Sequence, residues 1–376
     1  MKSFYFSIIC IILGNCGYSQ KTTHVGLGVG IQELTDKVSI SVVNLLDNYF
    51  GTIDSDSAQI KYGLSTDILL FPKPLLKLSY YQTSFYYNDT KYYKPTILNI
   101  VPQNDSIIMV TIAFSHCSSN DFSAIPAILN VVIKNKDGDL KIGNTTNYYL
   151  EKYKWNKLKI GRNYYFWSPQ TSFSEIKLDS VKLFNSLLMS KLNQKTPIQF
   201  NYILASSINE LTDIQGFLFK NDNSSIAYTE IPNNTIFTAD SSNYYKHEIA
   251  HVYIHDNWPN IVPFFDEGLA VHWGSNGSIS LIQSLPHVKK YIKDNKYVEL
   301  DKFEILSAIN VPNYANLYYT IAGLICKTVE DEKGLDGIKK LIADGTEKDI
   351  YYAIEQALGV KKADLNVFLR KELEKY

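Results

Sequence analysis

The sequence predicts an α+β fold, in which a mostly antiparallel, β-rich N-terminal domain precedes a domain with a small sheet and a helical C-terminal half. Two patterns predict it: strand-like stretches dominate residues 22–170, and apolar residues at helical spacing dominate from residue 244 to the end. The chain also has 376 residues, more than the ~100 to 200 of one typical domain. We therefore expect two domains, residues 20–170 and 171–376.

The composition is that of an ordinary globular protein. Hydrophobic residues make up 45% of the chain, charged residues make up 20%, and the formal net charge is -1. With 37 basic and 38 acidic residues and no long basic run, the sequence lacks the positive surface that proteins use to bind nucleic acids. We therefore expect no nucleic-acid partner.

The N-terminus has the order of a secretory signal peptide. Lys2 precedes an apolar run over residues 4–13, and small or polar residues then lead to an expected cleavage after Ser19. A membrane anchor is an alternative, but about ten apolar residues fall short of the ~20 that cross a bilayer. Residues 1–19 are therefore expected to direct the mature chain to the periplasm, the cell surface or the medium, without a transmembrane segment.

Four cysteines offer no disulfide framework. Cys10 and Cys16 lie in the expected leader, which leaves Cys117 and Cys326 in the mature chain. Acylation of Cys16 would make a lipoprotein, although Asn15 stands where that signal needs a small residue. Cys117 and Cys326 can pair in an oxidising compartment, but they fall in different expected domains, so we expect two buried free thiols.

The expected N-terminal domain combines one helix with several strands. Apolar residues recur at helical spacing over residues 38–50. Stretches rich in Ile, Val and Tyr predict strands over residues 96–100, 107–114, 127–133 and 163–167. The cluster at residues 136–139 is typical of a hairpin turn. Nothing in this domain points to catalysis, and its Tyr and Phe residues are expected in sheet packing.

The expected C-terminal domain follows a break at Pro169. Ser172, with Glu175 three residues later, is the pattern of a capping box and predicts a helix up to Asn193. Strands are expected over residues 199–205 and 226–231. Helices are then expected over residues 244–256, 263–273, 316–331, 335–343, 347–358 and 361–374, several of them closed by a glycine.

His247, Glu248, Ile249, Ala250 and His251 form an HExxH motif within one of these helices. At ~3.6 residues per turn, the two His side chains project from one face and can hold the same zinc ion. Glu248 is rotated by about 100° from His247, which can set its carboxylate beside a water on the metal. The motif therefore predicts a single Zn²⁺ site with Glu248 as the general base.

A catalytic zinc site needs three protein ligands and one open position. The metzincin continuation would require Gly at position 254 and His at position 257, where this chain has Ile254 and Asn257. Glu267 is the better candidate, because Pro263 favours a new helix that would carry this carboxylate toward the first one. Together with the two His it would complete a His2Glu ligand set.

HEIAH and FFDEGLA, with 15 residues between His251 and Glu267, together carry a family resemblance. The pair resembles the peptidase MA-like gluzincins, zinc metallopeptidases of the thermolysin type, in which HExxH precedes a helix with an (N/D)EG(hydrophobic)A motif. The resemblance covers about residues 171–376, which implies a gluzincin-like catalytic domain and hydrolysis of peptide bonds in a protein or peptide substrate. Tyr319 stands where such enzymes often have a tyrosine.

Four neighbouring residues allow more than one interpretation. His255 lies one turn beyond the motif, but three side chains along one helix cannot readily surround a metal at ~2.0 to 2.1 Å, so we expect it beside the ligands. Asp266 can hydrogen-bond a ligand imidazole or simply favour the helix dipole. Tyr319 can donate to an oxyanion or pack in the core. His272 is expected to be an ordinary polar residue.

The motifs and the resemblance predict a secreted or periplasmic zinc peptidase. Glu248 would accept a proton from a water activated by Zn²⁺ and later return it to the leaving amine. The choice of an amide over an ester substrate comes from the resemblance alone. One alternative is a catalytically inactive zinc-binding or partner-binding protein on the same fold, against which the intact Glu248 argues; another is a structural protein with an accidental HExxH.

Overall fold

The computed structural model describes most of the chain from residue 24 onward. The described residues are 24–31, 36–52, 56–67, 70–71, 73, 75, 77–78, 86–87, 90–91, 93–116, 124–221, 225–240, 242, 244–277, 279–311, 316–345 and 350–376. The expected signal peptide and Cys117 lie outside these residues.

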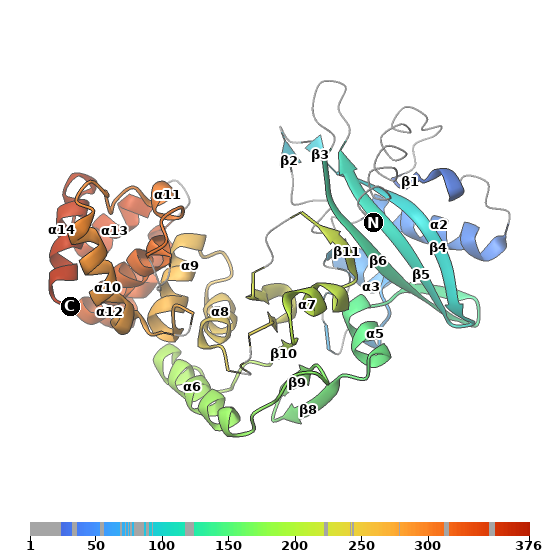
Figure 1. Cartoon of the computed structure of the whole chain (residues 1–376), viewed down its shortest axis with the longest axis horizontal. Coiled ribbons are helices and arrows are strands. Elements are labelled where there is room, and N and C mark those ends of the chain that lie inside the picture. Colours follow the sequence, from blue (N-terminus) through green and yellow to red (C-terminus); the bar gives the residue numbers. More distant parts are fainter. Residues whose placement is uncertain are drawn as a thin grey trace.

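The fold is mixed α+β, with a β-rich region at one end and a helical C-terminal region at the other (Figure 1). A second, smaller sheet lies between them. Helices α8 (Lys246–Asn257) and α9 (Pro263–Leu269) lie between this second sheet and the C-terminal helices (Figure 1). The predicted α+β class, with strands first and helices last, is confirmed.

The first sheet has the strand order β1-β4-β5-β6-β11, with β7 paired to β6. Its strands are β1 (Gly26–Leu27), β4 (Lys94–Asn104), β5 (Ile107–His116), β6 (Ala124–Lys136), β7 (Asp139–Ile142) and β11 (Phe217–Lys220). β1 runs parallel to β4, and the other pairs are antiparallel. The predicted mostly antiparallel sheet is therefore present, and it includes one strand from much later in the chain.

Local sequence explains the elements around this sheet. Helix α2 (Lys37–Gly51) begins where the Asp36 side chain accepts from the Ser39 amide at 2.8 Å, and its buried apolar face joins the core of the first sheet. The predicted hairpin between β6 and β7 is confirmed, because Asp137 and Gly138 both have positive φ, as its tight turn requires. The shorter elements here are η1 (Val29–Ile31), α3 (Asp56–Tyr62), β2 (Tyr86–Tyr87) and β3 (Thr90–Lys91).

The second sheet has the order β12-β13-β10-β9-β8. Its strands are β8 (Asn156–Ile160), β9 (Asn163–Trp167), β10 (Asn201–Leu204), β12 (Ala227–Glu230) and β13 (Thr235–Thr238). The central strand β10 is parallel to β9 and β13, whereas β8 and β12 run antiparallel at the two edges. Strands on both sides of residue 170 thus pair with one another, and the division into domains at that point stays a prediction.

Most of the predicted helices are present in the second half of the chain, with some differences at their ends. From residue 145 onward the helices are α5 (Thr145–Lys152), α6 (Ile176–Leu192), α7 (Ile208–Ile214), η3 (Ile231–Asn233), α8, α9, η4 (Ala270–Gly274), α10 (Leu281–Asp294), α11 (Phe303–Leu306), α12 (Leu317–Asp344), α13 (Ile350–Leu358) and α14 (Lys362–Glu374). The predicted capping box at Ser172 is wrong, because α6 begins only at Ile176 and Glu175 caps it without a side-chain hydrogen bond.

The predicted break between the helices over residues 316–331 and 335–343 is confirmed. Both belong to α12, which is interrupted by a kink at Gly334, where the backbone is non-helical and φ is +63°. Helix α10 was not expected, since it contains Pro286, a residue that usually ends a helix. Its start is fixed by a capping box between Ser280 and Gln283.

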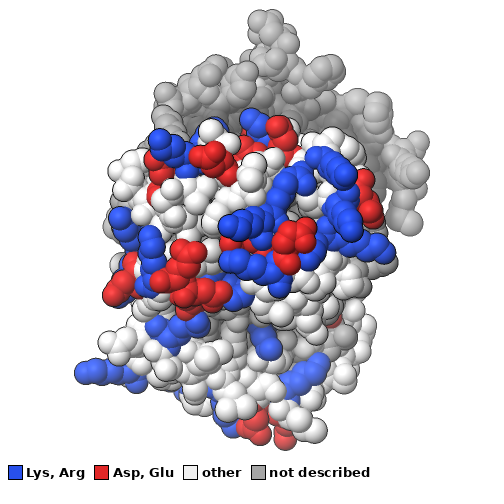
Figure 2. Space-filling model, turned by 90° about the vertical axis from the view of Figure 1, so that its left-hand side faces the viewer, with Lys and Arg blue, Asp and Glu red and all other residues white. Residues whose placement is uncertain are grey.

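The helical end of the molecule has a mixed surface charge. Figure 2 shows Lys and Arg side chains interspersed with Asp and Glu on this face. Lys289 on α10 and Glu374 on α14 form one ion pair of the region, at 3.0 Å. Because exposed pairs contribute only about 0 to 1 kcal/mol, the buried apolar contacts between these helices hold the region together.

The helices and the Cys326 thiol bear on the expected membrane segments and free cysteines. Of the helices among the described residues, none is both long enough and apolar enough to cross a membrane. Cys326 on α12 is a buried free thiol, as predicted, and burial raises its pKa far above the usual range.

Candidate metal centre

Helix α8 carries the HExxH motif through the middle of the molecule. Its apolar residues Ile249, Ala250, Val252, Tyr253 and Ile254 are all fully buried in the main core. Packing on these sides leaves the face with the two histidines toward a cavity, where His247, Glu248 and His251 are each less than 9% exposed. The predicted helical placement of the motif is confirmed.

Helix α9 brings the downstream carboxylate to the same point. Val262 is extended and Pro263 opens the helix, as predicted, so that Glu267 follows one turn later. Gly268 allows α9 to lie directly against α12, because a Cβ at this position would lie 2.8 Å from the Ala322 carbonyl oxygen. The close packing of α9 on α12 therefore fixes where the Glu267 side chain points.

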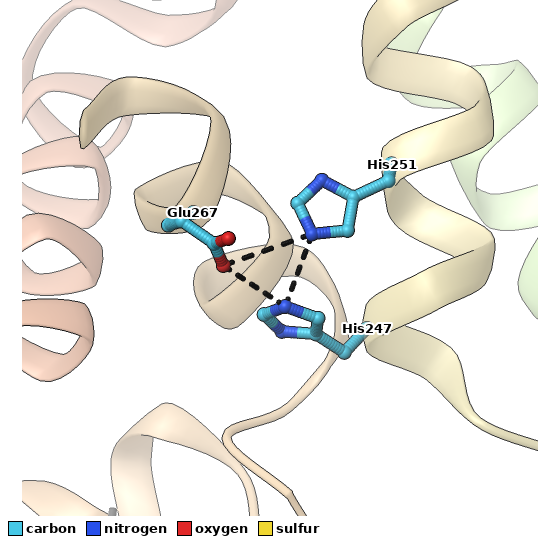
Figure 3. Close-up of side chains that lie close together, drawn as sticks. All are labelled: His247, His251 and Glu267. Atoms are coloured by element: carbon cyan, nitrogen blue, oxygen red, sulfur yellow. Dashed lines mark hydrogen bonds and ion pairs between the residues drawn. The ribbon is translucent and has the colours of Figure 1, made fainter. Parts of the chain in front are cut away.

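The three predicted metal ligands converge. The His247 Nε2 and His251 Nε2 atoms are 3.1 Å apart, and the Glu267 Oε2 atom lies 3.1 Å from the first and 3.7 Å from the second. Figure 3 shows the two imidazoles from α8 and the carboxylate from α9 pointing at one another. Ligands at ~2.05 Å from a tetrahedral zinc lie ~3.3 Å apart, so the triangle has the size that a zinc ion requires.

Hydrogen bonds at the other ring nitrogens orient the two imidazoles. His247 donates from Nδ1 to the Ser275 carbonyl oxygen at 2.9 Å, and His251 donates from Nδ1 to Asp266 Oδ1 at 2.7 Å. A neutral ring that donates from Nδ1 has its lone pair on Nε2. Both lone pairs therefore face the centre of the triangle, as metal coordination needs, and the donor set fits one Zn²⁺ ion.

The electrostatics of these groups favour a positive charge at their centre. Burial opposes charge on His251, but Asp266 and Glu267 outweigh it and raise the pKa of this ring well above its usual value. Burial raises the pKa of Glu267, but hydrogen bonding to His247 and His251 outweighs it and lowers this pKa to about 2. Carboxylates that stay ionised beside imidazoles are the setting in which a divalent cation binds.

Asp266 links two imidazoles. Its Oδ1 atom accepts from His251, and its Oδ2 atom lies 2.8 Å from His255 Nε2. His251, His255 and Asp266 also form a second group whose ligand atoms lie within 4.8 Å of one another. Glu267 lies with both HExxH histidines, whereas His255 lies against Asp266, so the arrangement favours Glu267 over His255 as the third ligand.

Glu248 faces the cavity beside the triangle. Its Oε2 atom accepts from the Thr229 hydroxyl at 2.7 Å, and the same hydroxyl lies 3.0 Å from the backbone oxygen of Glu248. Thr229 lies on β12, at the edge of the second sheet. Nothing in the sequence pattern singled out this residue.

The cavity has a volume of about 390 Å³. Besides the HExxH and Glu267 residues, its lining includes Tyr245, Asn276 and Tyr319, together with residues of β12. The Tyr319 ring centroid is 6.3 Å from that of His247, and the Tyr245 ring centroid is 6.4 Å from it. Burial, with nearby carboxylates, raises the pKa of each phenol to about 12, so both stay protonated donors near neutral pH.

His272 has a separate role. It donates from Nε2 to Glu330 on α12 at 2.6 Å, and Trp273 Nε1 donates to the same carboxylate oxygen at 2.9 Å. Lys191 on α6 donates to the other oxygen of Glu330. This partly buried network joins η4 to α6 and α12.

Comparisons with known proteins add little to this geometry. No protein-family model matches the chain, and no curated protein matches it. Among solved structures, the chain is similar to an M1 zinc metallopeptidase of Deinococcus radiodurans bound to a Tyr-Ser-Ala substrate, with a TM-score of 0.31 and 8% identity over 75% of this chain. The chain spans 62% of that protein's length.

Proposed function

We propose that this chain is a zinc-dependent peptidase that hydrolyses peptide bonds in a protein or peptide substrate. The observation that carries the proposal is the convergence of His247 Nε2, His251 Nε2 and Glu267 Oε2 at 3.1 to 3.7 Å, with Glu248 beside them in one cavity. Two oriented imidazoles and one carboxylate that can bind the metal, with a second carboxylate beside them, are the parts of a hydrolytic zinc site.

Each residue has a distinct part in the proposed reaction. Zn²⁺, when bound by His247, His251 and Glu267, would lower the pKa of a water toward ~7 and polarise the substrate carbonyl. Glu248 accepts the proton of the attacking water and returns it to the leaving amine. Tyr319, whose pKa is about 12, donates a hydrogen bond to the carbonyl oxygen as negative charge develops there.

The edge of strand β12 suits the binding of an extended peptide substrate. The strand pairs with β13 on one side, and no described strand pairs with it on the other. Ala227, Tyr228 and Thr229 of this strand line the cavity. A peptide added along the free edge of β12 would form backbone hydrogen bonds while its scissile bond lies beside Glu248.

Export of the protein belongs to the same proposal. Residues 1–19 have the order of a secretory signal peptide. We therefore place the mature enzyme in the periplasm, at the cell surface or in the medium. Expression with residues 1–19 intact, followed by N-terminal sequencing of the exported chain, should find a mature N-terminus at Gln20.

Metal content and cleavage of a mixed peptide library test the catalytic proposal. The mature chain should contain about one zinc per protein and cleave peptides, and a strong chelator should abolish cleavage. Glu248→Gln should keep the metal and lose cleavage, whereas Glu267→Ala should lose both. Glu299→Gln, at an exposed position on the helical end, is the matched carboxylate control and should behave like the parent.

Two results would contradict the proposal. Equal zinc content in Glu267→Ala and the parent would remove Glu267 from the ligand set. A parent that binds zinc but leaves every peptide of the library intact would favour the catalytically inactive alternative.

A further inference from the structure

Thr229 donates to the carboxylate that the proposed reaction uses as its base. The distance from Thr229 Oγ1 to Glu248 Oε2 is 2.7 Å, and the distance to the Glu248 backbone oxygen is 3.0 Å. A hydroxyl has one hydrogen to donate, and a hydrogen bond to an ionised acceptor is the stronger of the two. The Thr229 hydrogen therefore goes to the carboxylate.

This contact treats the two carboxylate oxygens differently. Oε2 accepts from Thr229, whereas among the described residues no group donates to Oε1. Glu248 is 6% exposed and lines the cavity, so Oε1 is the atom left to accept a proton from a water there. Without a partner, the Glu248 carboxylate could rotate about its Cγ–Cδ bond. The hydrogen bond from Thr229 restricts that rotation.

Thr229 is itself held rigidly. It lies in the middle of β12, paired with Ile236 of β13 in antiparallel register. The hydroxyl is therefore fixed by a sheet, and the base that it contacts is fixed by the first turn of α8. Groups on regular elements keep a catalytic geometry better than groups on loops do.

We propose that Thr229 is a positioning residue, which holds Glu248 Oε2 so that Oε1 faces the attacking water. Its catalytic consequence rests on the proposed peptidase function, whereas the contact between the two side chains does not. The same strand that would bind the substrate backbone thereby also orients the base. Strand β12 then positions both the peptide substrate and the Glu248 carboxylate.

The test compares Thr229→Val, which keeps the shape and removes the hydroxyl, with Thr229→Ser, which keeps the hydroxyl. In the holoenzyme, Thr229→Val should lower kcat roughly tenfold, as loss of a hydrogen bond to a charged group does, while KM and zinc content stay near the parent values. Thr229→Ser should recover most of kcat. Thr235→Val removes a buried hydroxyl from the neighbouring strand β13 and is the matched control.

A second readout does not depend on activity. In the metal-free protein, the infrared carboxylate band of Glu248, isolated by subtracting the Glu248→Gln spectrum, should shift in Thr229→Val and stay in place in Thr229→Ser. Thr229→Ala is measured in parallel and serves the same purpose if the Val variant does not fold.

Each outcome decides between the contact and its alternatives. An unchanged band together with an unchanged kcat in the Val variant would overturn the proposal. A lower kcat accompanied by a raised KM and a lower Tm, with the band in place, would assign Thr229 to holding β12 and overturn the positioning role. A band that shifts in Thr229→Val, combined with a parent that has no peptidase activity, would support the contact and reject the proposed function.

Discussion

Asp266 is the residue on which the candidate site depends most after the ligands themselves. Its carboxylate accepts a hydrogen bond from His251 at 2.7 Å and contacts His255 at 2.8 Å. Because the side chains of Asp266, His251 and His255 are largely buried, water has little room to replace the carboxylate. A carboxylate that accepts from a ligand imidazole fixes the tautomer and makes the ring a better donor to a metal. His255 in turn holds the carboxylate.

Replacing Asp266 should weaken zinc binding without removing a ligand. We expect Asp266→Asn to raise the Kd for zinc about 10 to 100-fold, because the amide is a poorer acceptor for the His251 Nδ1 hydrogen. His255→Asn should raise it less, since Asp266 keeps its bond to His251. Competition with a chromophoric chelator measures both, with His287→Asn on α10 as the control. A Kd unchanged in Asp266→Asn would show that the carboxylate does not act through the ring.

Glu330 should make the stability depend on pH in the acid range. Burial raises its pKa, but hydrogen bonds from His272, Lys191 and Trp273 outweigh this and lower it from 4.5 to about 2. A carboxyl group whose pKa is lower in the folded state than in the unfolded state stabilises the fold fully at pH values above its unfolded-state pKa. This stabilisation is lost as the pH falls through its folded-state pKa. The gap in unfolding free energy between the parent and Glu330→Gln should therefore be full above pH ~5 and close toward pH ~2.

Urea unfolding of the two proteins at several pH values measures that gap. Glu332→Gln, a change at a neighbouring exposed carboxylate, should show no such pH-dependent difference. A gap that stays constant between pH 5 and 2 would mean that Glu330 is not ionised against its partners.

Single residues also show what sequence reasoning can find. His247, His251 and Glu248 follow from a spacing along one helix, and Glu267 follows from a motif on the next. Thr229 and Tyr245 were missed, because the first reaches the site from a sheet edge and neither belongs to a spacing pattern. The Ser275 carbonyl was missed for another reason, since a backbone acceptor leaves no mark in the residue type.

Among the elements, the contact between α8 and η4 controls the position of the first ligand. Gly274 ends η4, and a Cβ there would lie 2.9 Å from the His247 backbone nitrogen. The next residue, Ser275, supplies the carbonyl that orients the His247 ring. The π-helical turn of η4 thus ends against the start of α8, an arrangement often found at functional sites.

Gly274→Ala should therefore act on the metal site through the backbone. The added methyl group must push α8 away from η4, which we expect to destabilise the fold by about 1 to 3 kcal/mol and to weaken zinc binding. Chemical unfolding and chelator competition measure the two effects. Ser275→Ala keeps the carbonyl and should leave zinc binding nearly intact; equal effects of the two variants would contradict this account.

The helices and strands were predicted well where a pattern is local. The helix near residues 38–50, the β6–β7 hairpin and the helices that carry the two motifs all follow from periodicity, turns and caps. Strand β11 and helix α10 were missed. Four residues are too few to show a period, and Pro286 hides a helix that tertiary packing and its capping box maintain.

At the scale of the whole molecule, the two halves of the chain exchange strands. β11 comes from the second half and pairs with β6 of the first sheet, while β9 comes from before residue 170 and pairs with β10 on one side and with β8 on the other. A shared apolar cluster also joins residues such as Met109 and Tyr149 to Ile203 and Phe237. These pairings were beyond sequence reasoning, because no local pattern specifies which distant strand fills an edge.

This exchange predicts that residues 171–376 do not fold independently. Without β8 and β9, the fragment would leave the edge of β10 unpaired and expose the shared apolar cluster. We expect it to lack the near-UV circular dichroism of the full chain and to bind a hydrophobic dye. A fragment that unfolds cooperatively with a native near-UV spectrum would contradict this and support two autonomous domains.

The late arrival of β11 also has a consequence for synthesis of the protein. Residues Ala127–Leu129 of β6 receive their partner β11 only after residues 217–220 have left the ribosome, about eighty residues after β6 itself, whereas Ile133–Lys136 pair with β7, which follows β6 directly. Until then this apolar segment of the nascent chain has an unpaired edge, a template for pairing with other chains. We therefore expect a holdase chaperone to bind the nascent chain within this interval.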